Sequence, residues 1–313
     1  MDIKKLNFAI DNGALSTISN EMDPMLIQEK YFISKSLSLF TPKVVGGIGA
    51  QKINLLDVEN YWQDTACDMS TSGGTTFTQR TLEVAPISIR QSMCKTSFYD
   101  YWQTYFMKAG LDESLGELES QILDAYIKQI SAKQEIAVWQ AVDGGSNYYD
   151  KFDGLIEILS GSSCVDITAA SAVTYTDIDD SVNLMTDAIP ESISMEQPLK
   201  LYLSVKEFKA LARKYNDTYK GFQERTFNSN YTMDSPLIPN LTIEAVGGLN
   251  GTSKMVLTTD DNIFVPVYDG PEGKIRLQYI VDEVTDLHWF KYDFIMGVQI
   301  GRPEYVVTNF LTA

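Results

Sequence analysis

The sequence predicts an α+β protein, and three stretches of the chain lead to this class. Residues 53–93 are strand-like and indicate a two-stranded ribbon, and residues 112–142 carry the apolar stripe of one long helix. The stretch after residue 150 mixes short helices with strands and ends in a series of strands, with no visible internal repeat.

Length and charge limit the classes of protein to consider. The 313 residues, of which 44% are apolar, suffice for about two domains of ~150 residues or for one large unit with insertions. No apolar run approaches the ~18 residues of a membrane span, and no hydrophobic signal core follows Met1–Lys5. With 25 basic against 42 acidic residues the net charge is −17, which disfavours nucleic-acid binding through a basic face. We expect a soluble protein, and its three separated cysteines fit a reducing compartment: Cys67, Cys94 and Cys164.

Residue types that carry chemistry are scarce. The single histidine, His288, lies in an aromatic strand-like run, where we expect a packed or edge side chain rather than a catalytic base. The pair Asp260-Asp261 precedes an asparagine and is typical of a turn. The segment Gly46–Gly49 lacks the Lys-Ser/Thr ending of a phosphate-binding loop. The sequence therefore predicts no catalytic, cofactor-binding or metal-binding site.

The first forty or so residues indicate an arm rather than a domain. A short helix is expected to begin at Asp23-Pro24, with Asp23 as N-cap and Pro24 at the first helical position, and to end before Thr41-Pro42. One helix cannot bury a core alone. This arm must therefore lie on other structure, which could be a neighbouring chain.

The ribbon is expected over residues 53–93. Its strands include Ile53–Leu56 and Thr75–Val84, with a flexible polar tip at Ser70–Gly74. Pro86 implies a bend or bulge and argues against a central position in a sheet. Because an isolated hairpin is marginally stable in water, the ribbon must fold back on its own domain or be held by a partner.

The strongest helix signal covers residues 112–142. Its apolar stripe includes Leu118, Ile122 and Ile130, and Asp143-Gly144-Gly145 ends it. About thirty residues at ~1.5 Å each make a structural strut of ~45 Å.

Shorter elements follow the long helix. A helix is expected over Asp177–Ala188, a strand over Leu199–Leu203, and a second helix behind the capping box of Ser204 and Glu207. The polar, aromatic stretch Thr218–Pro239 is expected to be an exposed loop. Turns rich in Gly, Asn and Asp then separate the remaining expected strands: Leu241–Val246, Met255–Leu257, Ile263–Val267, Ile275–Val281, His288–Tyr292, Phe294–Ile300 and Glu304–Val307.

This order of elements resembles the major capsid proteins of tailed bacteriophages with the Hong Kong 97-type fold. The resemblance covers nearly the whole chain and lies in these segments: Thr75–Leu82, Cys94-Lys95-Thr96 with Tyr101-Trp102, the long helix reaching Glu135–Gln140, Phe152–Leu155, and the stretch from Pro239–Ile243 to Leu257–Ile263.

The resemblance implies a division of the chain into the parts of that fold. These would be an N-terminal arm (1–45), the start of a peripheral domain (46–56), an extended β-hairpin loop (57–93), the peripheral domain with the spine helix 112–142 (94–164), an axial domain (165–270), and C-terminal strands largely in the peripheral domain (271–313).

The resemblance also implies a structural role without catalysis or cofactor. Copies would self-assemble into the hexamers and pentamers of an icosahedral shell enclosing double-stranded DNA, in a virion assembled in the bacterial cytoplasm. A portal protein and decoration or scaffolding proteins would be further partners, with no membrane involved. The candidate contacts between subunits are Tyr31, Phe32, Phe77, Arg80, Leu82 and Arg90.

Two alternatives stay open. An encapsulin-type nanocompartment shares the fold but would enclose a cargo enzyme rather than a genome. A soluble carbohydrate-binding or enzymatic α+β domain would line a cleft with Tyr, Trp and Asp from residues 99–105, 146–150 and 286–293, although aromatic packing in cores and interfaces is the favoured explanation of these residues.

Overall fold

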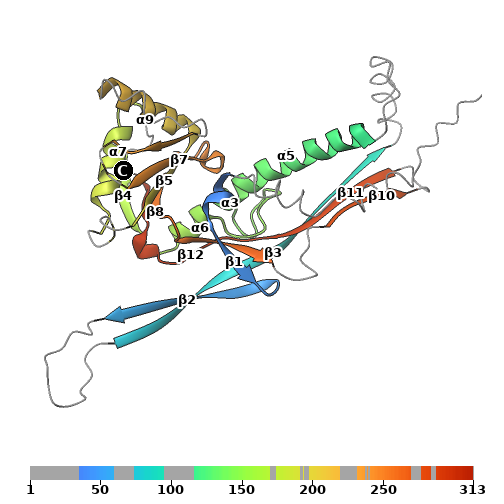
Figure 1. Cartoon of the computed structure of the whole chain (residues 1–313), viewed down its shortest axis with the longest axis horizontal. Helices are drawn as coiled ribbons and strands as arrows, with labels where there is room; N and C mark the ends of the chain where they lie inside the picture. The colour runs from blue at the N-terminus through green and yellow to red at the C-terminus, as the bar shows by residue number, and fades with distance from the viewer. Residues whose placement is uncertain are drawn as a thin grey trace, which may run out of the picture. The chain divides into compact units, whose positions relative to one another are not determined.

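The computed structural model confirms the α+β class (Figure 1). The chain divides into two compact units, each assembled from several separate segments. Unit 1 comprises Met1–Ile33, Pro86–Ser131 and Gly270–Ile295, and unit 2 comprises Ser34–Ala85, Ala132–Asp269 and Met296–Ala313. The structure describes residues 35–59, 74–94, 116–169, 174–190, 193, 197–218, 231–236, 238, 240–268, 276–282 and 287–312.

Unit 2 contains a six-stranded mixed sheet in the order β4-β13-β8-β5-β7-β6. In this sheet β5 runs parallel to β7 and antiparallel to β8, while β13 runs parallel to β4 and antiparallel to β8. The strands span β4 (Val165–Ala169), β5 (Leu199–Leu203), β6 (Thr232–Asp234), β7 (Leu241–Ala245), β8 (Val256–Thr259) and β13 (Val307–Thr312).

Two amphipathic helices, α7 (Ile178–Asp187) and α9 (Val205–Thr218), pack against this sheet and against each other. Both predicted helices are confirmed. The capping box before α9 is confirmed too: the Ser204 N–H donates to the Glu207 carboxylate at 3.1 Å, and the Glu207 N–H donates to Ser204 Oγ at 3.2 Å. The helices bury an apolar stripe that meets the inner face of the sheet: Ile178, Val182, Met185, Phe208, Leu211 and Tyr215.

The long helix is present as α5 (Gly116–Gln140), and it ends close to the predicted boundary. Gly144 follows with φ of +72°, a left-handed conformation that glycine adopts without strain. The turn at Phe152–Leu155 then leads into the short helix α6 (Leu155–Ser160). No helix in the described part of the chain is long and apolar enough to cross a bilayer.

Residues 35–45, which were predicted to belong to the arm, are packed into unit 2. They form the helix α3 (Lys35–Leu39) and the strand β1 (Thr41–Val45), so the helix ends before Thr41 as predicted, while its expected start lies outside the described residues. A three-stranded sheet takes up β1, in the order β1-β9-β12, with β9 (Ile263–Tyr268) and β12 (Gln299–Ile300). Residues 35–45 are therefore part of unit 2, and the rest of the predicted arm lies outside the described residues.

The ribbon is formed by β2 (Gly49–Glu59) and β3 (Gly74–Cys94). Its antiparallel ladder runs from Gly49 opposite Val84 to Glu59 opposite Gly74, so the hairpin begins before the predicted residue 57. The strand β3 continues through Pro86, where a bend or bulge was predicted, and it lies between β2 and β11 in the order β10-β11-β3-β2. Pro86 has no N–H to donate, but the ladder with β2 ends at Val84. The proline therefore costs no hydrogen bond of that ladder.

The strands β10 (Arg276–Asp282) and β11 (Leu287–Met296) form an antiparallel pair. The predicted break between Tyr292 and Phe294 is wrong, because β11 passes through Asp293 without interruption. His288 lies within this strand, opposite Val281, as the aromatic run predicted.

The end of the chain departs from the prediction. A 3-10 turn occupies Pro303–Tyr305, and the last strand begins only at Val307. This strand joins the six-stranded sheet, where it lies between β4 and β8. The predicted loop Thr218–Pro239 likewise contains a short strand, β6, whose Met233 is buried.

Candidate interaction surface

The two faces of the β2–β3 ribbon differ in exposure. Directly opposed residues of an antiparallel pair project from the same face, and faces alternate along each strand. One face carries Ile53 and Leu82, which are buried within unit 2. The other face is exposed along the ladder, through the pairs Lys52–Thr81, Asn54–Gln79, Leu56–Phe77 and Val58–Thr75.

Three large apolar side chains lie together on the exposed face. Phe77 is 75% exposed and stands directly opposite Leu56, and Val58 lies two residues farther along β2. Leu56 is 50% exposed and Val58 is 53% exposed. We call Leu56, Val58 and Phe77 the ribbon patch. Exposed apolar clusters on a hairpin are typical of contact sites with another surface.

The base of the ribbon is held by the segment that follows β11. Arg302 forms an ion pair with Asp57 at 2.5 Å and donates to the Leu56 carbonyl at 2.9 Å. Gln299 donates from Nε2 to the Thr81 carbonyl. Gly297 lies so close to the Glu83 carbonyl that a β-carbon there would clash with it. These contacts fix the direction of the ribbon at its root and leave the ribbon patch uncovered.

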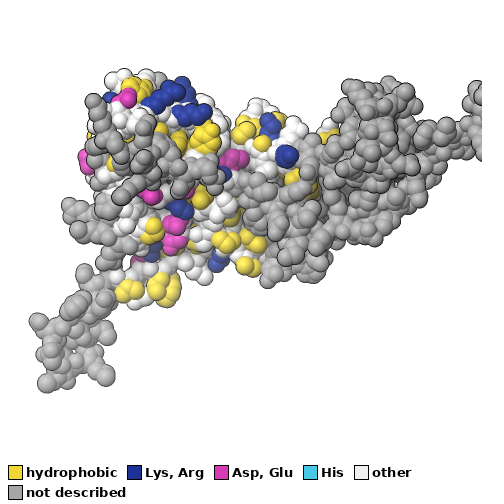
Figure 2. Space-filling model, turned by 45° about the horizontal axis from the view of Figure 1, so that its top comes forward, with side chains coloured by type: hydrophobic (Ala, Val, Ile, Leu, Met, Phe, Trp, Pro, Cys, Tyr) yellow, Lys and Arg dark blue, Asp and Glu magenta, His cyan; other side chains and the backbone are white. Residues whose placement is uncertain are grey.

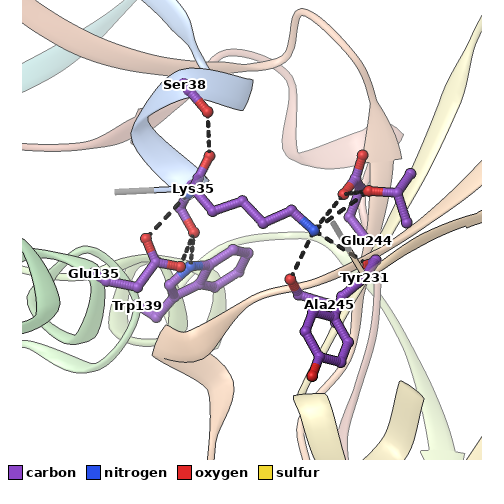
Figure 3. A network of polar contacts seen from close by, with 9 residues as sticks. Lys35, Ser38, Glu135, Trp139, Tyr231, Glu244 and Ala245 are labelled. Carbon is purple, nitrogen blue, oxygen red and sulfur yellow. Dashed lines mark hydrogen bonds and ion pairs between the residues drawn. The ribbon is translucent and has the colours of Figure 1, made fainter. Parts of the chain in front are cut away.

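Polar contacts also hold the segment at which the arm enters unit 2 (Figure 3). The Ser36 N–H and Oγ donate to the two oxygens of Glu135 at 3.1 and 2.6 Å, and the Trp139 indole N–H donates to Ser36 Oγ at 2.7 Å. Lys35 pairs with Glu244 at 2.7 Å and donates to the Ala245 carbonyl at 3.0 Å. This helical turn therefore joins α5 to the strand β7.

An aromatic cluster lies beneath this network. Phe40 packs edge-on against Trp139 and Tyr202, with ring centroids 5.9 and 5.8 Å apart, and Trp139 lies 5.4 Å from Tyr202. All three side chains are buried, and burial raises the pKa of the Tyr202 hydroxyl well above its ordinary value. Phe40, which directly follows α3, is thus part of the folded core of unit 2.

The predicted contact residues fall into different environments. Phe77 is in the ribbon patch, Arg80 is half-buried on the opposite face, and Arg90 is exposed in unit 1. Leu82 is fully buried in its own subunit, so it has no surface left for a neighbour; it belongs to the inner face of the ribbon. Tyr31 and Phe32 lie outside the described residues.

Sequence reasoning missed Leu56, Val58 and Arg302. Alternation along residues 54–58 placed Leu56 and Val58 on one face, but only the strand register sets them beside Phe77. Nothing local marks Arg302, whose partner Asp57 is far away in the sequence.

Few groups outside these surfaces could do chemistry. No cluster of three or more His, Cys, Asp or Glu suited to a metal ion occurs among the described residues. Cys164 is half-buried beside Thr308, and burial raises the pKa of its thiol. A high thiol pKa lowers the thiolate fraction and makes this cysteine a poor nucleophile.

The sequence matches no protein-family model and no curated protein. Solved structures do match it. The satellite phage P4 procapsid including the size determination (Sid) protein gives a TM-score of 0.61 at 13% identity, with 96% of each chain covered. The capsid of Myoviridae phage XM1 gives 0.52 at 14% identity, covering 84% of this chain and 86% of that one. A virus-like particle from Pyrococcus furiosus gives 0.53 at 11% identity, covering 91% and 96%.

Proposed function

We propose that this chain, which has the fold of the tailed-phage major capsid proteins, is a structural shell protein without enzymatic activity. The Hong Kong 97-type fold expected from the sequence is confirmed at the level of the whole chain. We infer that copies assemble into hexamers and pentamers of an icosahedral shell around double-stranded DNA, in a virion formed in the bacterial cytoplasm.

The ribbon patch is the observation that carries this proposal. A two-stranded ribbon buries little of its own surface, and here Leu56, Val58 and Phe77 project from it without cover. Burying one such side chain in an interface gains about 1.5–3 kcal/mol. A neighbouring subunit laid against the ribbon patch would supply that burial. Phe77, Arg80 and Arg90, with Tyr31 and Phe32 of the arm, stay our candidates for contacts between subunits.

The division of the chain supports the same role. In our proposal α5 is the spine of the peripheral domain, the six-stranded sheet with α7 and α9 forms the axial domain, and the ribbon is the extended loop. A net charge of −17 would keep the shell lining from adhering to packaged phosphate. A portal protein, with scaffolding or decoration proteins, would complete the particle.

A second candidate is an encapsulin-type compartment with a protein cargo. The likeness to the virus-like particle from Pyrococcus furiosus favours it, because that match covers 91% of this chain. The two candidates differ in what the shell contains, and both require closed shells.

Expression of the full-length chain, followed by sedimentation and negative-stain microscopy, tests the proposal. We expect closed shells from wild-type protein. The Phe77→Asp variant should stay folded but associate at least about tenfold more weakly. The reason is that a carboxylate would replace an apolar side chain that the proposed interface buries. Val142→Asp, at another exposed apolar position outside the ribbon, serves as the matched control and should assemble normally.

Each outcome decides a different point. A wild-type chain that stays monomeric at all concentrations overturns the shell function. Normal assembly of Phe77→Asp retains the shell function and removes the ribbon patch from the interface. Shells purified from infected cells with protein and no DNA inside favour the encapsulin-type alternative.

A further inference from the structure

The helices α7 and α9 contact each other and cover different strands of the six-stranded sheet. α7 packs against β4 and β13, at the β4 edge, and α9 packs against β7, next to the β6 edge. Figure 1 shows both helices beside the sheet. α7 therefore lies on the side of the sheet toward β4, and α9 lies on the side toward β6.

The two helices carry opposite charge. α7 and its N-cap contain four aspartates and no basic residue, whereas α9 contains four basic residues. The side chains of Lys and Arg gather over α9 in Figure 2. In a chain of net charge −17, a basic helix is a local exception that bulk composition does not explain.

The exposed charges form one stripe on each helix. On α7 the exposed residues are Asp180, Leu184 and Asp187, spaced by four and three positions. On α9 the exposed charged residues are Lys206, Lys209, Arg213 and Asp217, spaced by three, four and four positions, and the first three of them are basic. These spacings place each set on a single helical face. We call the set on α7 the acidic stripe and the three basic residues on α9 the basic stripe.

Helix stability explains only part of the two stripes: Asp180 lies in the first turn of α7, where its charge is favourable to the helix dipole. Asp187 lies at the C-terminus of α7 and Lys206 in the first turn of α9, where each charge opposes the helix dipole by about 0.3–1 kcal/mol. No charged residue of either stripe forms an ion pair with another residue of the described part of the chain.

The segment that precedes α7 contacts α9 within one chain through other residues. The Tyr175 hydroxyl donates to Asp217, and the Lys214 ammonium lies 5.6 Å from the centre of the Tyr175 ring. This contact uses Lys214 and Asp217 of α9 and none of the residues of the two stripes.

We propose that the acidic stripe of one copy docks on the basic stripe of the next, head to tail, in a ring of copies; this inference rests on the proposed shell function. An edge that paired with itself would set like charges together, whereas head-to-tail pairing sets Asp180 and Asp187 against Lys209 and Arg213. The β4 edge of one sheet then faces the β6 edge of its neighbour.

Each stripe also offers an apolar contact. Leu184 is 50% exposed between the two aspartates. Near the basic stripe Tyr231 is 49% exposed, with the Lys209 ammonium 5.9 Å from its ring centre. An aliphatic side chain against an aromatic ring is the kind of anchor found at the centre of protein interfaces. A nucleic-acid partner would account for the basic stripe and leave the acidic stripe without a role.

Paired charge reversals test the docking. The variants D180K/D187K and K209D/R213D should each weaken association at least about tenfold, measured as the apparent dissociation constant by sedimentation at low salt. The combined variant restores opposite charges across the contact and should recover most of the wild-type affinity. D143K/D261K makes the same change of charge as D180K/D187K at exposed turn positions and should associate like wild type.

The outcomes separate this inference from the shell function. Wild-type shell yields from either single-edge variant, or no recovery in the combined variant, overturn the docking and leave the shell function standing. Rings that never close into shells, yet respond to the reversals as expected, keep the docking and overturn the shell function. If K209D/R213D loses DNA binding while association is unchanged, the basic stripe is a nucleic-acid contact and the docking is overturned.

Discussion

Replacing Ser36 with alanine should destabilise unit 2 by about 3 kcal/mol. The lost hydroxyl donates to the Glu135 carboxylate at 2.6 Å and accepts from the Trp139 indole at 2.7 Å, and all three residues are buried. A hydrogen bond to a charged group contributes about 1.5–3 kcal/mol, and a buried N–H without an acceptor costs about 1–3 kcal/mol. The two losses overlap because one atom makes both bonds, so we take a value near the lower end of their sum of about 2.5–6 kcal/mol.

Urea unfolding of the full-length chain, followed by circular dichroism, measures this loss. All variants are compared at one protein concentration, because self-association also contributes to apparent stability. Ser38→Ala is the matched control: it removes a hydroxyl from the same helix, but that hydroxyl is exposed and donates only to the Lys35 carbonyl. We expect the control to change stability by less than about 0.5 kcal/mol.

Two results would refute the reasoning. If Ser36→Ala unfolds at the wild-type midpoint, the network in Figure 3 does not hold the root of the arm. If Ser38→Ala is equally destabilised, the effect comes from the helix itself and the buried contacts are irrelevant to it.

Three further predictions concern other parts of the chain. Ile130→Pro in the middle of α5 should cost about 3 kcal/mol or more and yield insoluble protein, whereas Ile130→Ala should stay soluble, as a solubility assay would show. Burial raises the pKa of the Glu207 carboxyl above its ordinary value, although the hydrogen bonds from Ser204 lower it. The folded state therefore holds this proton more tightly than the unfolded state, and wild type should lose stability relative to Glu207→Gln as pH rises from about 4 to 7. The melting temperature of each protein, measured across this pH range, tests this. A melting temperature that changes with pH by the same amount in both proteins would contradict it. The high pKa of the Cys164 thiol should slow its alkylation at least about tenfold relative to the urea-unfolded chain, measured by peptide mass spectrometry, and equal rates would mean that the thiol is accessible and ionised.

Local signals predicted those parts of the fold whose reasons are local. The capping box of Ser204 and Glu207 lies within one helical turn, and α9 follows it as expected. The strand at residues 75–84 and the long helix likewise follow from periodicity alone. Each of these elements owes its identity to neighbours a few residues away.

Contacts between distant residues left no such signal. Lys35 and Glu244 form an ion pair although they are far apart in the sequence, and neither is unusual in its own segment. The three-residue strand β6 exists because β7 offers it an edge, and not because its sequence favours a strand.

The ribbon shows a signal that was present but not used. Phe77 and Leu82 are an odd number of positions apart, so strand alternation already places them on opposite faces. Only one of them can face a neighbour, and the structure leaves Phe77 uncovered and buries Leu82.

The six-stranded sheet can be completed only after its last strand in the sequence, β13, has been translated. This strand lies between β4 and β8, although β4 is translated long before it. At about 5–20 residues per second, a ribosome leaves the inner edge of β4 open for roughly seven to thirty seconds and the inner edge of β8 open for roughly two to ten seconds. During the shorter of these intervals the nascent chain has two strand edges whose backbone groups are unpaired. A stop codon before Val307 would leave both edges unpaired permanently.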